Sequence, residues 1–289
     1  MDVLVFGGTR LMGRHLVQAL LDGGHRVAIA TRGLAPDPFG DRVARLVLDR
    51  HDDASLQKNL PRKTYDVVFD DLAYCSNDIT ALFAAVRCKR YVQVSSASVY
   101  PVCHMDLREE EFDPWRAPLV ACGRDDFPYG EAKRQAESAI VQQHGGVPAA
   151  MARFPMVVGT DDYTKRLYFY VEHIVRQKPM FVESPEGRLP FVRSDEAGRF
   201  LAFLGESGFT GPINGAGRGA ACAAQIMDYV TSRTGLAPVL SPDGDPAPYN
   251  GAEDHSLNTD RAAALGFSFT PLEAWMGALL DDYIRQAQG

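Results

Sequence analysis

A glycine-rich turn after the first apolar run constrains the fold of this chain more than any other feature. Residues 3–6 are strand formers, and 14–22 are an amphipathic stretch with helical spacing. A tight turn between such elements brings backbone N–H groups to the positive end of the helix, where a diphosphate binds well. A plain strand–helix turn is the alternative. The turn predicts a dinucleotide site made by Gly7, Gly8, Thr9, Arg10, Leu11, Met12 and Gly13.

Short apolar runs alternate with helical stretches through the first half of the chain. Further strands are predicted at 27–30, 46–48, 66–69, 91–94 and 149–154, and helices at 77–86 and 129–143. This alternation predicts an α/β fold, a Rossmann-type doubly wound parallel sheet with right-handed crossovers. Ligands of such sheets bind at the carboxyl ends of the strands.

The second half is less regular and predicts a smaller C-terminal lobe. Helices are expected at 167–175, 196–204 and 271–286, a strand at 190–192, and loops at 205–219 and 235–251. We therefore expect a dinucleotide-binding Rossmann domain at 1-155 and a mainly substrate-binding lobe at 156-289. Part of 190-215 is expected to return to the Rossmann sheet.

Composition narrows the class of protein. With 46% hydrophobic and 23% charged residues among 289, the chain is an ordinary globular sequence, and no apolar run approaches the ~20 residues of a membrane helix. The net charge of −7 weighs against a broad nucleic-acid surface. No secretory pattern is present, so we expect a cytoplasmic protein. Five cysteines lack C-x-x-C spacing and seven histidines lack ligand spacing, so we predict reduced thiols and no metal site.

The end of the second strand bears on the choice of cofactor. It reads Thr31-Arg32-Gly33, without the acidic residue that bonds the ribose 2′-hydroxyl in NAD-specific enzymes. Arg32, with Arg10, could hold a 2′-phosphate as a charged donor, which favours NADP over NAD. A solvated Arg32 without a role in binding is the alternative. Asp49, after the third strand, is placed either to meet the adenine or to cap a turn.

Hydroxyl, phenol and amine groups are expected to converge at the other end of this crevice. Ser96 follows the fifth strand, and Tyr129 and Lys133 lie four residues apart, on one face of the helix at 129–143. An ammonium group and a positive nicotinamide ring would lower the pKa of a tyrosine, which is ordinarily near ~10. Tyr129 is therefore the candidate acid/base, Lys133 its electrostatic partner and a ribose ligand, and Ser96 the clamp on the substrate oxygen. Further cofactor contacts are expected at strand ends, from Leu72, Ala73, Ser95, Phe154 and Pro155.

Together these motifs resemble the extended short-chain dehydrogenase/reductase family, which includes nucleotide-sugar epimerases and dehydratases. The resemblance rests on the glycine turn and on 95–100 (SSASVY), 129–133 (YGEAK), 153–155 (RFP), 191–197 (FVRSDEA), 212–214 (PIN) and 260–267. It implies that Ser96, Tyr129 and Lys133 are catalytic. It also implies a homodimer built from two helices of each subunit, at 77–86 and 129–143.

The chain also departs from the family pattern. Ala97 and Ser98 stand where dehydratases often carry an Asp-Glu pair, which weighs against elimination of water. Met156 stands where nucleotide-sugar enzymes commonly place Asn, which weighs against a uracil diphosphate sugar. Arg188, in contrast, lies where such enzymes often bind a diphosphate.

Several other side chains keep two interpretations. Asp70 and Asp71, in place of the usual small residues after the fourth strand, are acid/base groups or turn residues. Tyr74 and Cys75 contact substrate or pack in a loop, and His104 is a second acid/base group or a surface histidine. Arg166 and Arg188 bind an anionic group or lie on an exposed surface.

We therefore expect an NAD(P)-dependent oxidoreductase or epimerase-like enzyme. It would transfer hydride between a nicotinamide cofactor, NADP or NAD, and a carbonyl or secondary alcohol of a small-molecule substrate. The alternative is a catalytically silent Rossmann protein that acts as an RNA-binding or regulatory module, because the G-G-T-R form of the turn also resembles chloroplast RNA-binding relatives. The acidic net charge weighs against a nucleic-acid partner, and no membrane partner is expected.

Overall fold

A seven-stranded parallel sheet forms the centre of the molecule. The computed structural model describes residues 1–289, and the sheet has the order β13-β8-β7-β5-β1-β2-β3 with every neighbouring pair parallel. The predicted α/β fold class is confirmed. The chain order reverses beside β1, which places a crevice at the carboxyl ends of β1 and β5. The strands are β1 (Asp2–Phe6), β2 (Arg26–Thr31), β3 (Val43–Val47), β5 (Val67–Asp70), β7 (Tyr91–Ser96), β8 (Ala149–Phe154) and β13 (Gly211–Asn214).

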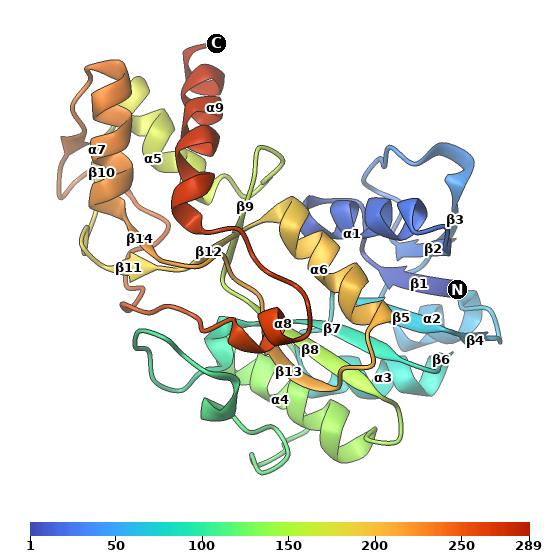
Figure 1. Ribbon diagram of the computed structural model, residues 1–289. Coiled ribbons are helices and arrows are strands. Elements are labelled where there is room, and N and C mark those ends of the chain that lie inside the picture. Colours follow the sequence, from blue (N-terminus) through green and yellow to red (C-terminus); the bar gives the residue numbers. More distant parts are fainter.

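Helices cover both faces of this sheet (Figure 1). Alternate residues of β1 point to opposite faces, so Val3 and Val5 join one apolar cluster and Leu4 and Phe6 another. The first cluster is completed by α1 (Leu11–Asp22) and α6 (Ser194–Glu206). The second is completed by α2 (Asp53–Asn59), α3 (Ser76–Ala85) and α4 (Tyr129–Gln143).

The C-terminal lobe has an apolar core of its own. In Figure 1, α5 (Arg166–Val175), α7 (Ala223–Thr234) and α9 (Met276–Gln288) lie together beyond β9 (Met156–Val158) and β12 (Phe191–Arg193). Smaller pairings involve β10 (Pro179–Phe181) with β15 (Val239–Leu240) and β16 (Asp245–Pro246), β11 (Arg188–Leu189) with β14 (Ala221–Cys222), and β4 (Thr64–Tyr65) with β6 (Arg87–Cys88). The short α8 (Asp260–Ala264) lies beside β13. None of the helices combines the length and apolar character that a membrane span requires.

Several predicted elements need correction. The loop expected at 205–219 contains β13, and this strand, not the one expected at 190–192, returns to the sheet; β12 pairs with β9 instead. The glycine and proline of β13 are typical of a loop in the sequence. The strand tolerates Pro212 because it lies at the edge of the sheet. The third strand begins at Val43, α9 begins only at Met276, and the sequence analysis assigned neither α2 nor α7.

One ion pair inside the protein attaches α4 to the sheet. Arg153 in β8 and Glu137 in α4 are both fully buried, with Nη2 of Arg153 2.7 Å from Oε2 of Glu137. The Arg153 guanidinium also donates to the carbonyl oxygens of Glu109 and Phe112, and Ser95 donates to Oε1 of Glu137 at 2.5 Å. Since burial removes both charges from water, each needs these internal partners. The pair fixes the helix on which Tyr129 and Lys133 lie.

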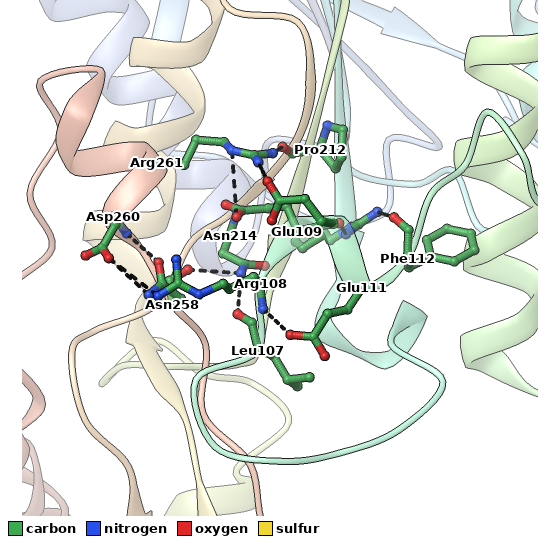
Figure 2. A network of polar contacts seen from close by, with 12 residues as sticks. Leu107, Arg108, Glu109, Glu111, Phe112, Pro212, Asn214, Asn258, Asp260 and Arg261 are labelled. Carbon is green, nitrogen blue, oxygen red and sulfur yellow. Dashed lines mark hydrogen bonds and ion pairs between the residues drawn. The ribbon is translucent and has the colours of Figure 1, made fainter.

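A second polar network attaches the segment after β7 to the edge of the sheet (Figure 2). The side chain of Asn214, at the end of β13, donates to the carbonyl oxygens of Leu107 and Asn258, both at 3.0 Å. Arg261 in α8 donates to the carbonyl oxygen of Pro212. The long connection between β7 and α4 is therefore anchored to β13 and to the C-terminal part of the chain.

The outward face of α4 is covered by the chain itself. Gln142 donates to the carbonyl oxygens of Pro114 and Ala117, and Gln135 donates to that of Pro118. The buried alanines and Ile140 of α4 pack instead toward the sheet and α3. Residues 114–118 therefore lie against α4, one of the two helices expected to form a dimer interface.

We predict that Glu137→Ala lowers the free energy of unfolding by about 3–5 kcal/mol, because it leaves the Arg153 charge buried without its partner. Denaturant unfolding followed by circular dichroism measures the loss. The matched control, Glu172→Ala, removes a carboxylate from a half-exposed pair with Arg176 and should cost far less. Equal losses in the two variants would contradict a special role of the buried pair.

Candidate active site

A cavity of about 540 Å³ lies at the carboxyl ends of the central strands, where the strand order reverses. Its size is that of a pocket for a small molecule or cofactor. The walls come from the glycine turn, from residues that follow β2, β3 and β5, and from the start of α4. The lining residues are Gly7, Gly8, Thr9, Arg10, Leu11, Met12, Ala30, Thr31, Arg32, Leu34, Ala35, Leu48, Asp49, Arg50, His51, Asp71, Leu72, Tyr74, Val94, Arg124, Tyr129, Lys133 and Tyr163.

Backbone geometry explains the glycines of the turn. Gly7 and Gly8 have φ of +98° and +89°, a region that residues with a Cβ rarely adopt. A Cβ on Gly8 would also lie 2.8 Å from Cγ2 of Val17 in α1. No side chain caps the start of α1, and its first turn holds no acidic residue. The first N–H groups of the helix and its positive dipole end thus remain open to an anion.

Two arginines lie along the wall that follows β1 and β2. Arg32 is exposed, lines the cavity and pairs with no carboxylate. Arg10 lines the same cavity, with its guanidinium 4.9 Å from the centre of the Tyr163 ring. Asp49 lines the cavity, and its Oδ1 accepts the N–H of His51 at 3.0 Å, so it closes the turn that follows β3.

The first turn of α4 brings Tyr129 and Lys133 to the opposite end of the cavity. Gly130 allows this close approach, because a Cβ there would lie 2.3 Å from the carbonyl oxygen of Ser98. Ser96, at the end of β7, does not line the cavity itself but lies beside Tyr129 and accepts the N–H of Ser98 at 3.1 Å. The three residues expected to be catalytic therefore lie together.

The phenol of Tyr129 favours its protonated form. Protein atoms around the hydroxyl raise the pKa of Tyr129 although 46% of the residue is exposed, and the interaction with Ser96 and the charges of Arg166 and Arg124 only partly offset that rise. Tyr129 by itself is therefore a proton donor at neutral pH. A further positive charge beside it is needed to make it a base.

Lys133 is buried and held by the backbone. Its Nζ donates to the carbonyl oxygens of Ala73 at 2.7 Å and Val94 at 2.9 Å. It lies 4.7 Å from the ring centre of Tyr74 and 5.9 Å from that of Tyr129. Burial lowers the pKa of Lys133, an effect that Tyr74 and nearby aspartates oppose. The Lys133 ammonium group therefore lies near the rings of both Tyr74 and Tyr129, and the Tyr74 ring is the nearer.

The two aspartates after β5 have different surroundings. Asp70 is a structural residue: it accepts Arg50 at 2.6 Å and the N–H of Leu72 at 3.0 Å, away from solvent. Asp71 instead lines the cavity beside the glycine turn. Asp70 is therefore not an acid/base group, because both oxygens of its carboxylate already accept hydrogen bonds from the protein.

Five of the expected cofactor residues do not line the cavity. The alternation of β7 turns Val94 toward it and Ser95 toward Glu137 in α4. Phe154 packs against Phe200 of α6 in the apolar cluster between the sheet and that helix. The remaining three are Gly13, which lies beneath the turn against Asp71, Ala73, whose carbonyl oxygen holds Lys133, and Pro155, which follows Phe154.

Sequence reasoning missed Arg124, which lines the cavity with its guanidinium 3.6 Å from the centre of the Tyr74 ring. Arg124 lies in the irregular segment 101–128, where no periodicity marks a residue as functional. Tyr74, which kept two interpretations, packs edge-on against Tyr129 with ring centres 5.6 Å apart.

Other candidates lie outside the cavity. His104 pairs with Glu111 at an exposed site, and Arg188 pairs with Asp254 on the C-terminal lobe. Cys75 is buried in the small cluster with Cys122. Arg166, the first residue of α5, does not line the cavity, although its charge acts on Tyr129.

Most of the chain matches a known protein family. A model of the NAD dependent epimerase/dehydratase family matches residues 3–213. Among curated proteins, the chloroplast stem-loop binding protein of 41 kDa b from Arabidopsis thaliana is 29% identical over 112 residues, which are 34% of this chain and 30% of that protein. The match therefore spans less than a third of that relative.

Solved structures share the whole fold. UDP-glucose 4-epimerase from Thermotoga maritima, with UDP-glucose, has a TM-score of 0.75 and 18% identity over 100% of both chains. UDP-glucuronic acid 4-epimerase from Bacillus cereus, in complex with UDP-glucuronic acid and NAD, has a TM-score of 0.75 and 18% identity over 99% of both chains. Likeness at this identity establishes the fold, and the family match over residues 3–213 establishes descent: the chain belongs to the NAD dependent epimerase/dehydratase family.

Proposed function

We propose that this chain is a nicotinamide-dependent oxidoreductase or epimerase-like enzyme that acts on a carbonyl or secondary alcohol of a small molecule. The observation that carries the proposal is the convergence of the glycine turn, the uncapped start of α1, Tyr129 and Lys133 on one cavity. Membership of the NAD dependent epimerase/dehydratase family supports the same class of reaction.

The cavity fits a dinucleotide in shape and in chemistry. Gly7 and Gly8 keep the space beside the start of α1 free of side chains, where a diphosphate would lie. Arg32 and Asp49 would hold the adenosine half, and Leu72, Tyr129 and Lys133 the nicotinamide half. When bound there, the nicotinamide ring supplies the hydride chemistry.

The residues of the chain would handle the proton. The hydroxyl of Tyr129 would give a proton to a carbonyl oxygen during reduction, or take it from an alcohol during oxidation, while Ser96 would hold that oxygen. Arg124 and Arg166 lower the pKa of Tyr129 from outside, and a positive nicotinamide ring would add to their effect. Lys133, held by two carbonyl oxygens, would orient the ribose.

The second lobe, 156-289, would select the substrate. Tyr163 lies at the cavity mouth, and Met156 lies near Arg166, with the sulfur 3.8 Å from Nη1. A thioether offers no amide to a uracil ring. We propose a small substrate held by arginines rather than by such an amide. A screen should still begin with UDP-glucose and UDP-glucuronic acid, the ligands of the neighbours.

Some observations favour NAD as the cofactor, and others favour NADP. The Bacillus cereus neighbour was solved with NAD, which favours NAD for this fold. In this chain Arg32 follows β2 without a carboxylate partner, and no acidic residue stands there to bind a 2′-hydroxyl. We propose that Arg32 adds a contact to a 2′-phosphate, so that NADPH binds at least as well as NADH.

We predict that Arg32→Gln weakens NADPH binding about tenfold or more, the value of one charged hydrogen bond, and leaves NADH binding nearly unchanged. Fluorescence titration with both cofactors measures the two affinities. Arg87→Gln, which removes an exposed arginine of β6 outside the cavity, is the charge-matched control. An unchanged ratio of the two affinities in Arg32→Gln would show that Arg32 is a bystander.

We predict that Tyr129→Phe lowers kcat by about 10²–10⁴-fold on a substrate found by the screen, because the proton carrier is lost. Binding of NADH should remain within a few-fold. Tyr229→Phe, which removes a phenol of the C-terminal lobe far from the cavity, should keep full activity. Full activity of Tyr129→Phe would sink the assignment of Tyr129.

We propose that the chain does not pair through α3 and α4, because its own residues 114–122 cover α4. Light scattering after size-exclusion chromatography should then give a mass near 31.7 kDa. A mass of twice that value that falls to the single-chain value when α3 is altered, for example by Thr80→Arg on its exposed face, would contradict this.

The RNA-binding alternative is not favoured. The stem-loop binding relative matches only 34% of this chain, the net charge is −7, and the Ser96, Tyr129 and Lys133 set is intact. Polyanionic RNA would need a basic surface.

A further inference from the structure

Asp71 has no role in the reaction described above, yet it lies in the floor of the cavity. Its backbone N–H donates to the carbonyl oxygen of Phe6 at 3.2 Å, which places it beside the end of β1. Its carboxylate packs against the glycine turn: Oδ2 would lie 3.3 Å from a Cβ on Gly7 and 2.9 Å from a Cβ on Gly13. The glycines therefore make room for this acid as well as for a ligand.

The Asp71 carboxylate has no hydrogen-bond donor from the protein, in contrast to Asp70. The charged and titratable groups that act on it are Lys133 and Tyr129 from α4 and Asp70 from β5. Lys133 gives two of its three ammonium N–H groups to carbonyl oxygens and makes no hydrogen bond to Asp71, and the one charged side chain of the turn, Arg10, lies over Tyr163. Burial raises the pKa of Asp71 to about 7, against the opposing effect of Lys133.

A diphosphate at the start of α1 would bring two negative charges into the same cavity. An ionised Asp71 would repel them, because nearby like charges disfavour each other. A neutral carboxylic acid would not repel them, and its O–H could donate to a phosphate or ribose oxygen.

We propose that Asp71 contacts the cofactor and accepts it only as the neutral acid, so that each dinucleotide bound is accompanied by one proton. The inference rests on the proposed dinucleotide site and adds a proton-linked binding residue to it. Dinucleotide affinity should then be constant at low pH and fall as the pH rises, because deprotonation of Asp71 competes with binding.

The test is the affinity for NADH between pH 6 and pH 9. NADH is the better probe, since the 2′-phosphate of NADPH, as a phosphate monoester, titrates near ~6. In the wild type, Kd should rise about tenfold per pH unit above the midpoint. In Asp71→Asn it should stay nearly constant and be smaller than the wild-type value at pH 8. The matched control is Asp41→Asn, an exposed carboxylate outside the cavity, which should behave as the wild type.

Calorimetry in buffers of different ionisation heat gives an independent readout. At pH 8 the wild type should take up about one proton per NADH, and Asp71→Asn none. The folded state of the unliganded protein should show the same linkage: a raised carboxyl pKa means that stability falls as pH rises from the ordinary value of 3.8 toward 7. Asp71→Asn should therefore melt at a higher temperature than the wild type at pH 8, which also checks that the variant folds.

Three outcomes would overturn the proposal or its basis. A wild-type affinity that does not change with pH would overturn the inference and leave the proposed enzyme intact. A pH dependence that persists in Asp71→Asn and disappears in His51→Gln would assign the proton to His51, at the other end of the cavity. Absence of NADH binding to folded wild-type protein at every pH would remove the proposed function, and the inference with it.

Discussion

The buried ion pair between Arg153 and Glu137 is the interaction on which the site depends. It joins β8 to α4, and through the carbonyl oxygens of Glu109 and Phe112 it also holds the segment that crosses the end of the sheet. Any shift of the helix along the sheet would separate two buried charges from their hydrogen-bond partners, which costs free energy. Tyr129 lies about two turns and Lys133 about one turn before Glu137 on the same helix. Their positions at the cavity thus follow from a contact that takes no part in the chemistry.

The unpaired charges around the cavity are mostly positive, although the whole chain carries a negative net charge. The net charge is −7, yet Arg10, Arg32 and Arg124 line the cavity and none of them is paired with a carboxylate. Together with the uncapped start of α1, they make a local site for an anion on an acidic protein. Asp71 is the opposing charge at the centre of this arrangement, and its protonation decides whether the cavity is fully receptive.

Most of the sheet and the main catalytic candidates could be predicted from the sequence, because they depend on local patterns. The glycine turn, each apolar strand and the Tyr129–Lys133 spacing are all patterns of residues that are near neighbours in the sequence. What could not be predicted depends on contacts between distant residues. β13 has the composition of a loop and becomes a strand only beside β8. Arg124 belongs to an irregular segment and reaches the cavity through contacts that no local pattern marks, among them its stacking on Tyr74. Ser95 was expected to contact the cofactor, but its side chain turns toward Glu137, a residue 42 positions away whose place beside β7 only the fold determines.

The central claim is that the cavity at the reversal of strand order is a dinucleotide site. The most direct measurement is a fluorescence titration of the purified, cofactor-free protein with NADH at pH 6.5, repeated in the presence of ADP-ribose. The account predicts saturable binding of one NADH per chain that ADP-ribose displaces, because both share the diphosphate that the start of α1 would hold. Folded protein that binds neither molecule at millimolar concentration would contradict the account, whatever the family to which the chain belongs.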